Sequence, residues 1–134
     1  SRDKRPHNFM IDVSLDDKLY FQVNMNEGFS FDTTFWNPTI TYEDGTVYQA
    51  SEGFSGIQGQ GQWCYQYWDG KNYMNMVYDQ SFKIWRGKDA PNIPSIASDR
   101  QHPSEELDAA RVFVVPKDGT IRLIGAPSVI GTPH

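Results

Sequence analysis

The sequence predicts an all-β protein, an antiparallel β-sandwich that is jelly-roll-like and carries one short helical turn. Two observations support this fold class. Short runs of β-branched and aromatic residues recur along the chain, and Asp-Gly pairs follow some of them at residues 44–45, 69–70 and 118–119. Asp-Gly favours tight type I′ hairpins, in which both central residues take positive φ. Several short strands with turn signals between them are typical of a sandwich.

Seven strands are expected in order along the chain. Each is a run of β-forming residues bounded by turn-forming residues. The expected strands cover residues 18–24, 39–42, 62–68, 73–78, 83–85, 111–115 and 120–124.

Two other segments depart from this pattern. In HPSEELDAA, residues 102–110, Ser104 can cap a helical turn, and Glu105 and Glu106 face its positive end. The segment 87–98 contains two prolines and is expected to be a long irregular loop.

Length and charge limit the classes of function. The 134 residues suit one core, and we expect a flexible basic end at 1–8 and a single sandwich domain at 9–134, with a possible internal junction near 43–52. The net charge of −5 argues against a nucleic-acid partner. The longest apolar runs, such as 112–116, are too short to cross a membrane. The chain begins SRDKRPHNF without a methionine, so we expect it to come from a longer protein.

Cys64 is the only cysteine of the chain. It therefore has no partner for an intrachain disulfide, and cysteine usage does not identify the compartment. The residue lies in an apolar strand, where a buried and inert thiol is the usual state.

The stretch GQGQWCYQYWDGKNY, residues 59–73, concentrates five aromatic rings in eleven residues. Because side chains alternate along a strand, Trp63, Tyr65 and Tyr67 share one face, and Cys64, Gln66 and Trp68 share the other. This alternation alone does not identify the core face. In the following strand the face with Met74, Met76 and Tyr78 is the better candidate for the core.

Aromatic clustering has two interpretations. Most of the rings can fill the core, as sandwich cores are rich in aromatic residues. Alternatively, two or three rings stay partly exposed and stack on a sugar, whose C–H faces suit aromatic rings. Exposed rings with a polar rim are typical of a binding surface, and here the rim would consist of Gln58, Gln60, Gln62 and Asn72. Tyr73 belongs to this cluster as a candidate ligand-binding residue.

Three further groups contain candidate binding residues. FDTTFWNPTITY, residues 31–42, surrounds Trp36. KIWRG places Trp85 and Arg86 at the edge of the long loop, and His102 follows in RQHPS. A single histidine beside proline is more often a hydrogen-bonded loop anchor than a ligand contact. Trp85 is the ring that we expect to be exposed, and Trp85→Ala should then weaken binding without unfolding the domain.

The ordered series GFSGIQGQGQWCYQYWDG, YMNMVYD, WRG, QHP and DAARVFVVPKDGTIRLIG resembles a β-sandwich module appended to extracellular polysaccharide lyases and glycosidases of bacteria. DDKLYFQVNMNEGFSFDTTFWNPTITY resembles the closing part of the same module. The resemblance implies a carbohydrate-binding module and a secreted protein. It marks the following residues as motif positions: Trp63, Tyr65, Trp85, Arg86 and His102.

The order of the two similar stretches is reversed relative to that module. This chain would then be a permuted unit, or the end of one unit joined to the start of the next. Strands supplied by another copy would leave open edges, which favour a homodimer formed by strand exchange.

A catalytic role has less support. The chain has no nucleophile elbow, no zinc-ligand spacing, no phosphate-binding glycine loop and no dinucleotide fingerprint. A lyase could use Tyr73, His102 and Arg111 as base, acid and charge neutraliser, but such a set occurs by chance in many proteins. Carboxylates are available for a glycosidase at Asp32, Glu52, Asp69 and Asp79, and nothing pairs them.

We therefore expect a noncatalytic module without a cofactor that binds a polysaccharide or oligosaccharide and is covalently attached to a catalytic domain. A structural calcium ion on aspartates such as Asp44 is an open alternative. Arg86, Arg100 and Arg111 would suit an acidic sugar, whereas the negative net charge opposes one. The alternative function is a structural spacer or protein-interaction domain, which buried rings would favour.

Overall fold

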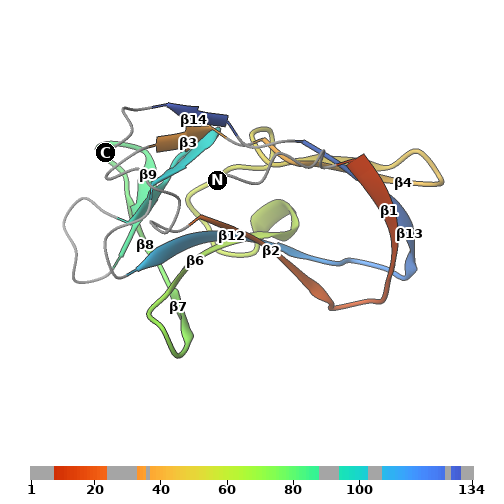
Figure 1. The fold of residues 1–134 in the computed structure, drawn as a ribbon, viewed down its shortest axis with the longest axis horizontal. Coiled ribbons are helices and arrows are strands. Elements are labelled where there is room, and N and C mark those ends of the chain that lie inside the picture. Colours follow the sequence, from red (N-terminus) through yellow and green to blue (C-terminus); the bar gives the residue numbers. More distant parts are fainter. Residues whose placement is uncertain are drawn as a thin grey trace.

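The computed structural model describes residues 8–23, 33–35, 37–87, 94–102, 107–125 and 128–130, and these segments are almost entirely β-structure (Figure 1). The strand pairings among them are all antiparallel. The one helical element in these segments is the 3₁₀ turn η1 (Gln60–Gln62). The predicted all-β, antiparallel, sandwich-like fold is confirmed.

The strands form three sheets. Sheet I has the order β1 (Asn8–Val13), β13 (Gly119–Ile124), β4 (Thr39–Tyr42) and β5 (Val47–Gln49). Sheet II has the order β14 (Ser128–Ile130), β3 (Thr33–Phe35), β11 (Arg100–His102), β10 (Ser95–Ile96), β9 (Ile84–Arg86) and β8 (Val77–Asp79). Sheet III has the order β2 (Lys18–Val23), β12 (Asp108–Val114), β6 (Trp63–Trp68) and β7 (Tyr73–Asn75).

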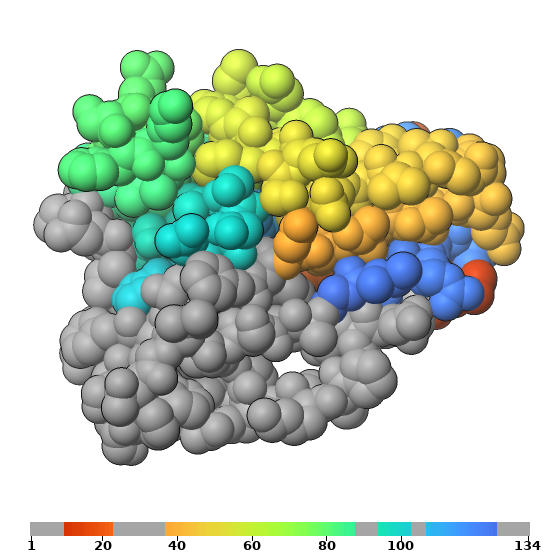
Figure 2. All heavy atoms as spheres, turned by 90° about the horizontal axis from the view of Figure 1, so that it is seen from above, coloured from red at the N-terminus to blue at the C-terminus, as the bar shows by residue number. Residues whose placement is uncertain are grey.

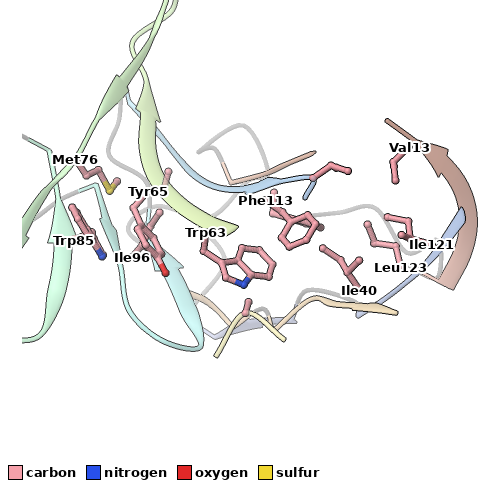
Figure 3. Packing of buried hydrophobic residues seen from close by; sticks show 14 of the residues in the cluster. Val13, Ile40, Trp63, Tyr65, Met76, Trp85, Ile96, Phe113, Ile121 and Leu123 are labelled. Atoms are coloured by element: carbon pink, nitrogen blue, oxygen red, sulfur yellow. The ribbon is translucent and has the colours of Figure 1, made fainter. Parts of the chain in front are cut away.

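Sheet III forms one layer, and strands of sheets I and II form the layer opposite (Figure 1). Figure 2 shows the layer formed by sheets I and II. Across it follow, in this order, the β8–β9 region (green), residues 94–102 (cyan), β4 (orange) and β13 (blue). The two layers enclose one row of buried side chains, which runs from Met76 and Trp85 through Trp63 and Phe113 to Val13 (Figure 3). All three sheets therefore share a core.

A bent two-stranded ribbon links sheets I and III. β1 pairs with β13, and β2 pairs with β12, so the connections β1–β2 and β12–β13 cross between the sheets side by side. The backbone N–H of Asp16, which has φ 72°, donates to the carbonyl of Val115 (2.8 Å), and the N–H of Val115 donates to that of Asp17 (2.8 Å). The Asp-Gly pair at 118–119 is thus part of a corner, and its prediction as a hairpin turn is wrong.

The other two Asp-Gly pairs do form hairpins, but not of the predicted type. In both, the glycine has positive φ, 93° at Gly45 and 99° at Gly70, whereas the aspartate does not. The Asp44 carboxylate accepts the N–H of Thr46 (2.9 Å), and that of Asp69 accepts two N–H groups of its own turn (2.8 Å each). These Asx contacts stabilise turns with negative φ at the aspartate, as in longer hairpin loops.

Most of the expected strands are present with small shifts at their ends, but the chain forms more strands than expected. The run 73–78 is divided at Met76 into β7 and β8, which belong to different sheets. Strands β1, β3, β5, β10, β11 and β14 were not expected. The predicted turn at Ser104 lies outside the described residues, and the last residues of HPSEELDAA belong to strand β12.

The core face of the aromatic hairpin, which the alternation of residues 63–68 left open, is the face of Trp63, Tyr65 and Tyr67. Trp63 and Tyr65 are 1% and 0% exposed, and Tyr67 packs against the core. The methionine face is the core side, as expected: Met76 is buried, Tyr78 packs against the core, and Met74 lies opposite Tyr67. Met74 is nevertheless 42% exposed. The physical reason is the position of β7, which projects from the rest of sheet III away from the opposite layer (Figure 1), so that Met74 has no second layer to cover it.

Candidate functional site

Three of the predicted ligand-binding residues are core residues. Trp85 is 3% exposed, and its ring stacks on that of Tyr65, with 4.9 Å between centroids and 12° between planes. The Trp63 ring packs against that of Phe113 at 5.0 Å. The expectation that Trp85 is exposed is wrong, and none of these three rings offers an accessible face to a sugar. The reason is that β6 and β9 direct them into the space between the sheets (Figure 3).

The other three predicted residues are half-buried on outer faces. Arg86 and His102 both lie opposite Ser95, so one row across β9, β10 and β11 brings them together. The Arg86 guanidinium pairs with the Asp79 carboxylate (3.2 Å). Tyr73 lies on β7 of sheet III, apart from this row. Trp36 lies outside the described residues.

Two glutamines of the expected polar rim instead support the fold. Gln62 Nε2 donates to the carbonyl of Val114 (2.8 Å). Gln58 Oε1 accepts the N–H of Tyr65 (2.8 Å), and its Nε2 donates to the Tyr65 carbonyl (2.7 Å). The Gln58 amide therefore pairs with β6 beside the point where β7 ends.

Gln58→Leu is expected to lower the free energy of unfolding by about 1–2 kcal/mol, because the N–H of the buried residue Tyr65 loses its acceptor. Chemical denaturation of the purified domain measures this change. Gln60→Leu is the matched control on the same loop, since Gln60 is exposed, and a change within about 0.5 kcal/mol is expected. Equal effects of the two substitutions would contradict a structural role of Gln58.

The outer face of sheet III gathers aromatic, amide and carboxylate side chains from all four of its strands. We call it the aromatic–amide face. It consists of Tyr20, Gln22, Gln66, Trp68, Tyr73, Asn75 and Asp108. These residues alternate along their strands with core residues such as Phe21 and Tyr65, which explains their outward direction.

The three rings of this face contact one another. Tyr20 and Tyr73 stack at 4.2 Å between centroids with an angle of 25°, and Trp68 lies 4.8 Å from Tyr73. Tyr20 remains 38% exposed, and Trp68 and Tyr73 are half-buried. Beneath these side chains, the outward-facing Ala110 and Val112 on β12 are buried. The rings therefore form an aromatic surface that is partly accessible to solvent.

Hydrogen bonds connect the polar groups across the same sheet. The Tyr73 hydroxyl donates to Gln22 Oε1 (2.6 Å), and Gln22 Nε2 donates to Asp108 Oδ2 (2.7 Å). Gln66 Nε2 donates to Asn75 Oδ1 (2.8 Å). β12 and β6 lie between β2 and β7, so the first two bonds link the two edges of sheet III.

Partial burial changes the acidity of two groups on this face. It raises the pKa of the Asp108 carboxyl, and the bond from Gln22 opposes this effect. It also raises the pKa of Tyr73, with further contributions from Tyr20 and Asp108. The surroundings thus disfavour additional negative charge.

Residues far apart in the sequence build this face, and several of them were not predicted. Tyr20, Gln22 and Asp108 are absent from the predicted site, whereas Trp68 and Tyr73 belong to the aromatic run. The alternation of Tyr20 and Gln22 around Phe21 was an available signal, but it does not reveal that β2 pairs with β12. That pairing brings Gln22 opposite Ala110 and next to Asp108.

Cys64 lies half-buried on the same outer face, opposite Val112, rather than fully buried. Burial raises the pKa of its thiol. The thiol is thus less readily ionised than a free cysteine.

The residues suggested for a lyase do not meet. Arg111 is buried on the core side of β12, Tyr73 lies on the opposite side of sheet III, and His102 lies on sheet II. Because Arg111 is inside the core, it is also unavailable to an acidic sugar.

The aspartates considered as calcium ligands form ion pairs or cap turns instead. Asp44 pairs with Lys117 (2.6 Å), Asp69 caps its own turn, and Asp79 pairs with Arg86. Among the described residues, no group of three or more His, Cys, Asp or Glu side chains is arranged to hold a metal ion. Asp32 lies outside those residues.

Comparisons with protein-family models, with curated proteins and with solved structures found no match to this chain. Within the described residues, no helix is long and apolar enough to cross a membrane. The aromatic–amide face is therefore the feature of this chain that bears most directly on its function.

Proposed function

We propose that this domain is a noncatalytic carbohydrate-binding module and that a sugar binds at the aromatic–amide face. The observation that carries this proposal is the meeting of three partly accessible rings with amide and carboxylate groups on one sheet face. Tyrosine and tryptophan combine an apolar ring with a polar atom, which suits the C–H faces and hydroxyls of a sugar. Amides donate and accept, and a carboxylate accepts hydroxyl protons.

The module would act by proximity. We propose that it belongs to a secreted protein and holds an attached polysaccharide-degrading domain near its polymeric substrate, which raises the effective concentration of that substrate. A single site of this kind is expected to bind weakly, with a dissociation constant of roughly micromolar to millimolar.

A structural spacer is the second candidate. The burial of Trp63, Tyr65 and Trp85 favours it, because the rings that were expected to bind a ligand instead fill the core. The spacer leaves unexplained why Tyr20, Trp68 and Tyr73 gather with amides on an outer face.

Affinity electrophoresis of the folded domain through gels that each contain one polysaccharide tests the proposal. Tyr20→Ala and Trp68→Ala are expected to weaken retardation by about tenfold, which corresponds to about 1.4 kcal/mol. Phe82→Ala is the control, because Phe82 is an aromatic residue that is 75% exposed in the turn between β8 and β9, away from sheet III, and it should bind like the wild type. Retardation that both face variants retain in full would place the sugar elsewhere, and no retardation in any gel would favour the spacer.

A further inference from the structure

The Asp108 carboxylate lies at one end of the aromatic–amide face and belongs to its network of polar groups. Asp108 is the first residue of β12 and lies opposite Trp68 in β6. Its Oδ2 accepts the amide of Gln22 (2.7 Å), and Gln22 in turn accepts the hydroxyl of Tyr73 (2.6 Å). A sugar that stacks on the Trp68 ring would therefore have this carboxylate beside it.

No positive charge balances Asp108 within the described residues. The ion pairs there involve Asp44, Asp79 and Asp99, and the only hydrogen bond to the Asp108 side chain comes from a neutral amide. Lys18 belongs to the same face, but it lies opposite Val114, six residues along β12 from Asp108. At about 3.4 Å per residue in an antiparallel strand, that separation is on the order of 20 Å, beyond the screening length at physiological salt.

The remaining charged groups near this end of the face do not form a cationic site either. Lys71 and Asp69 both lie in the turn between β6 and β7. The pKa of the Asp69 carboxyl is lowered by backbone hydrogen bonds from Asn72 and Lys71 and, to a smaller degree, by the charge of Lys71, so this lysine acts on the carboxylate of its own turn. The arginine on β12, Arg111, points into the core on the other side of the sheet. Among the residues that the structure describes, a ligand on this face thus meets a carboxylate that no cation pairs with, together with rings and amides.

This charge distribution distinguishes between classes of sugar. An ionised carboxylate accepts hydrogen bonds only, so it binds sugar hydroxyls through charge-assisted bonds. A uronate or sulfate group in the same place would bring a second negative charge into a partly desolvated site, to which the described part of the chain contributes no cation. The net charge of −5 adds long-range repulsion of such polymers.

We propose that the aromatic–amide face binds uncharged, hydroxyl-rich sugars and that Asp108 discriminates against glycans that carry carboxylates or sulfates. This inference rests on the proposed function, whose site it shares. It resolves the question left open by the sequence, where three arginines favoured an acidic ligand and the net charge opposed one.

Matched polymers test the inference, since each pair has the same sugar backbone and differs in charge. We would compare hydroxyethyl cellulose with carboxymethyl cellulose, and methyl-esterified with unesterified polygalacturonate, as the gel component in affinity electrophoresis. Affinity electrophoresis gives an apparent association constant for each polymer. For the wild type, we expect this constant to be at least tenfold larger for the uncharged member of a pair than for the charged member.

Asp108→Asn is the informative variant, because asparagine keeps the shape and an acceptor for Gln22 while it removes the charge. In this variant, the ratio of the association constant for the uncharged polymer to that for the charged polymer should fall by about tenfold. Asp12→Asn removes the same charge from an exposed position on sheet I and should keep the wild-type ratio. Thermal melting of each variant verifies that it is folded.

The outcomes separate the two proposals. Stronger or equal retardation by the charged members, or an unchanged ratio in Asp108→Asn, would overturn the inference and leave glycan binding intact. Absence of retardation by every polymer, with the protein folded, would overturn both proposals.

Discussion

Replacing Trp85 with alanine is expected to lower the free energy of unfolding by about 3–5 kcal/mol, the usual cost of truncating a buried tryptophan. The centroid of the Trp85 ring lies 4.9 Å from that of Tyr65 and 5.2 Å from that of Tyr78, and Trp85 is 3% exposed. Its indole N–H also donates to the Ser55 carbonyl (2.7 Å), which would lose its partner. Total stabilities of single domains are about 5–15 kcal/mol, so this change removes a large part of the total.

Thermal and urea denaturation measure the effect of Trp85→Ala. Phe82→Ala is a matched control, because it removes an aromatic side chain from the tip of the same β8–β9 hairpin, where the ring is 75% exposed. The control should change stability by less than about 0.5 kcal/mol. A Trp85→Ala domain with wild-type stability but lost glycan binding would restore the original expectation of an exposed ring.

The contrast between Trp85 and Tyr20 illustrates what this sequence can predict. The antiparallel all-β class follows from local signals, since strand-forming runs and turn residues report on their immediate neighbours. Burial of a ring depends on which sheets pack together. Trp85 and Tyr20 both lie in β-forming runs, yet one faces sheet III across the core and the other faces outward.

Long-range pairing also explains the corrected turn at 118–119. The local sequence is that of a tight turn, and the chain does change direction there. Whether the flanking strands pair with each other depends on distant parts of the chain. β13 lies between β1 and β4, and β12 lies between β2 and β6, so neither strand has a free side for the other. The sequence does not identify Asp108 as a site residue for the same reason. Its carboxylate becomes a binding candidate only because the fold brings Gln22 and Trp68 beside it.

Arg111 is buried, whereas arginine side chains normally lie at the protein surface. It is fully buried in the core, where its Nη2 donates to the Ala97 carbonyl (2.7 Å), and its Nε and Nη1 have no hydrogen-bond partner among the described residues. The guanidinium carbon lies 5.9 Å and 6.0 Å from the ring centroids of Tyr65 and Phe54. A buried charge normally has a partner of opposite charge, because its desolvation costs several kcal/mol.

Desolvation lowers the pKa of Arg111 to about 10, while nearby Tyr65 and Asp99 act in the opposite direction. A group with a lower pKa in the folded state destabilises the fold wherever it is charged in both states. Arg111 is charged in both states below its folded pKa, so the full cost of burial is present at neutral pH. That cost decreases only as the pH rises from about 10 towards the ordinary pKa of arginine.

Arg111→Met is therefore expected to raise the free energy of unfolding by about 2–3 kcal/mol at pH 7. Methionine fills most of the volume without a charge, and replacement of buried ionic groups by apolar residues is often stabilising by about 1–4 kcal/mol. Loss of the hydrogen bond to Ala97 reduces the gain.

Urea denaturation at pH 7 compares Arg111→Met with Arg122→Met, which makes the same change at an exposed position on β13 and should have an effect within about 0.5 kcal/mol. A marked destabilisation by Arg111→Met alone would contradict this prediction and would mean that the contacts of the guanidinium with Ala97, Tyr65 and Phe54 outweigh its desolvation. The stabilising result would instead identify Arg111 as a charge that the domain retains at the expense of its own stability.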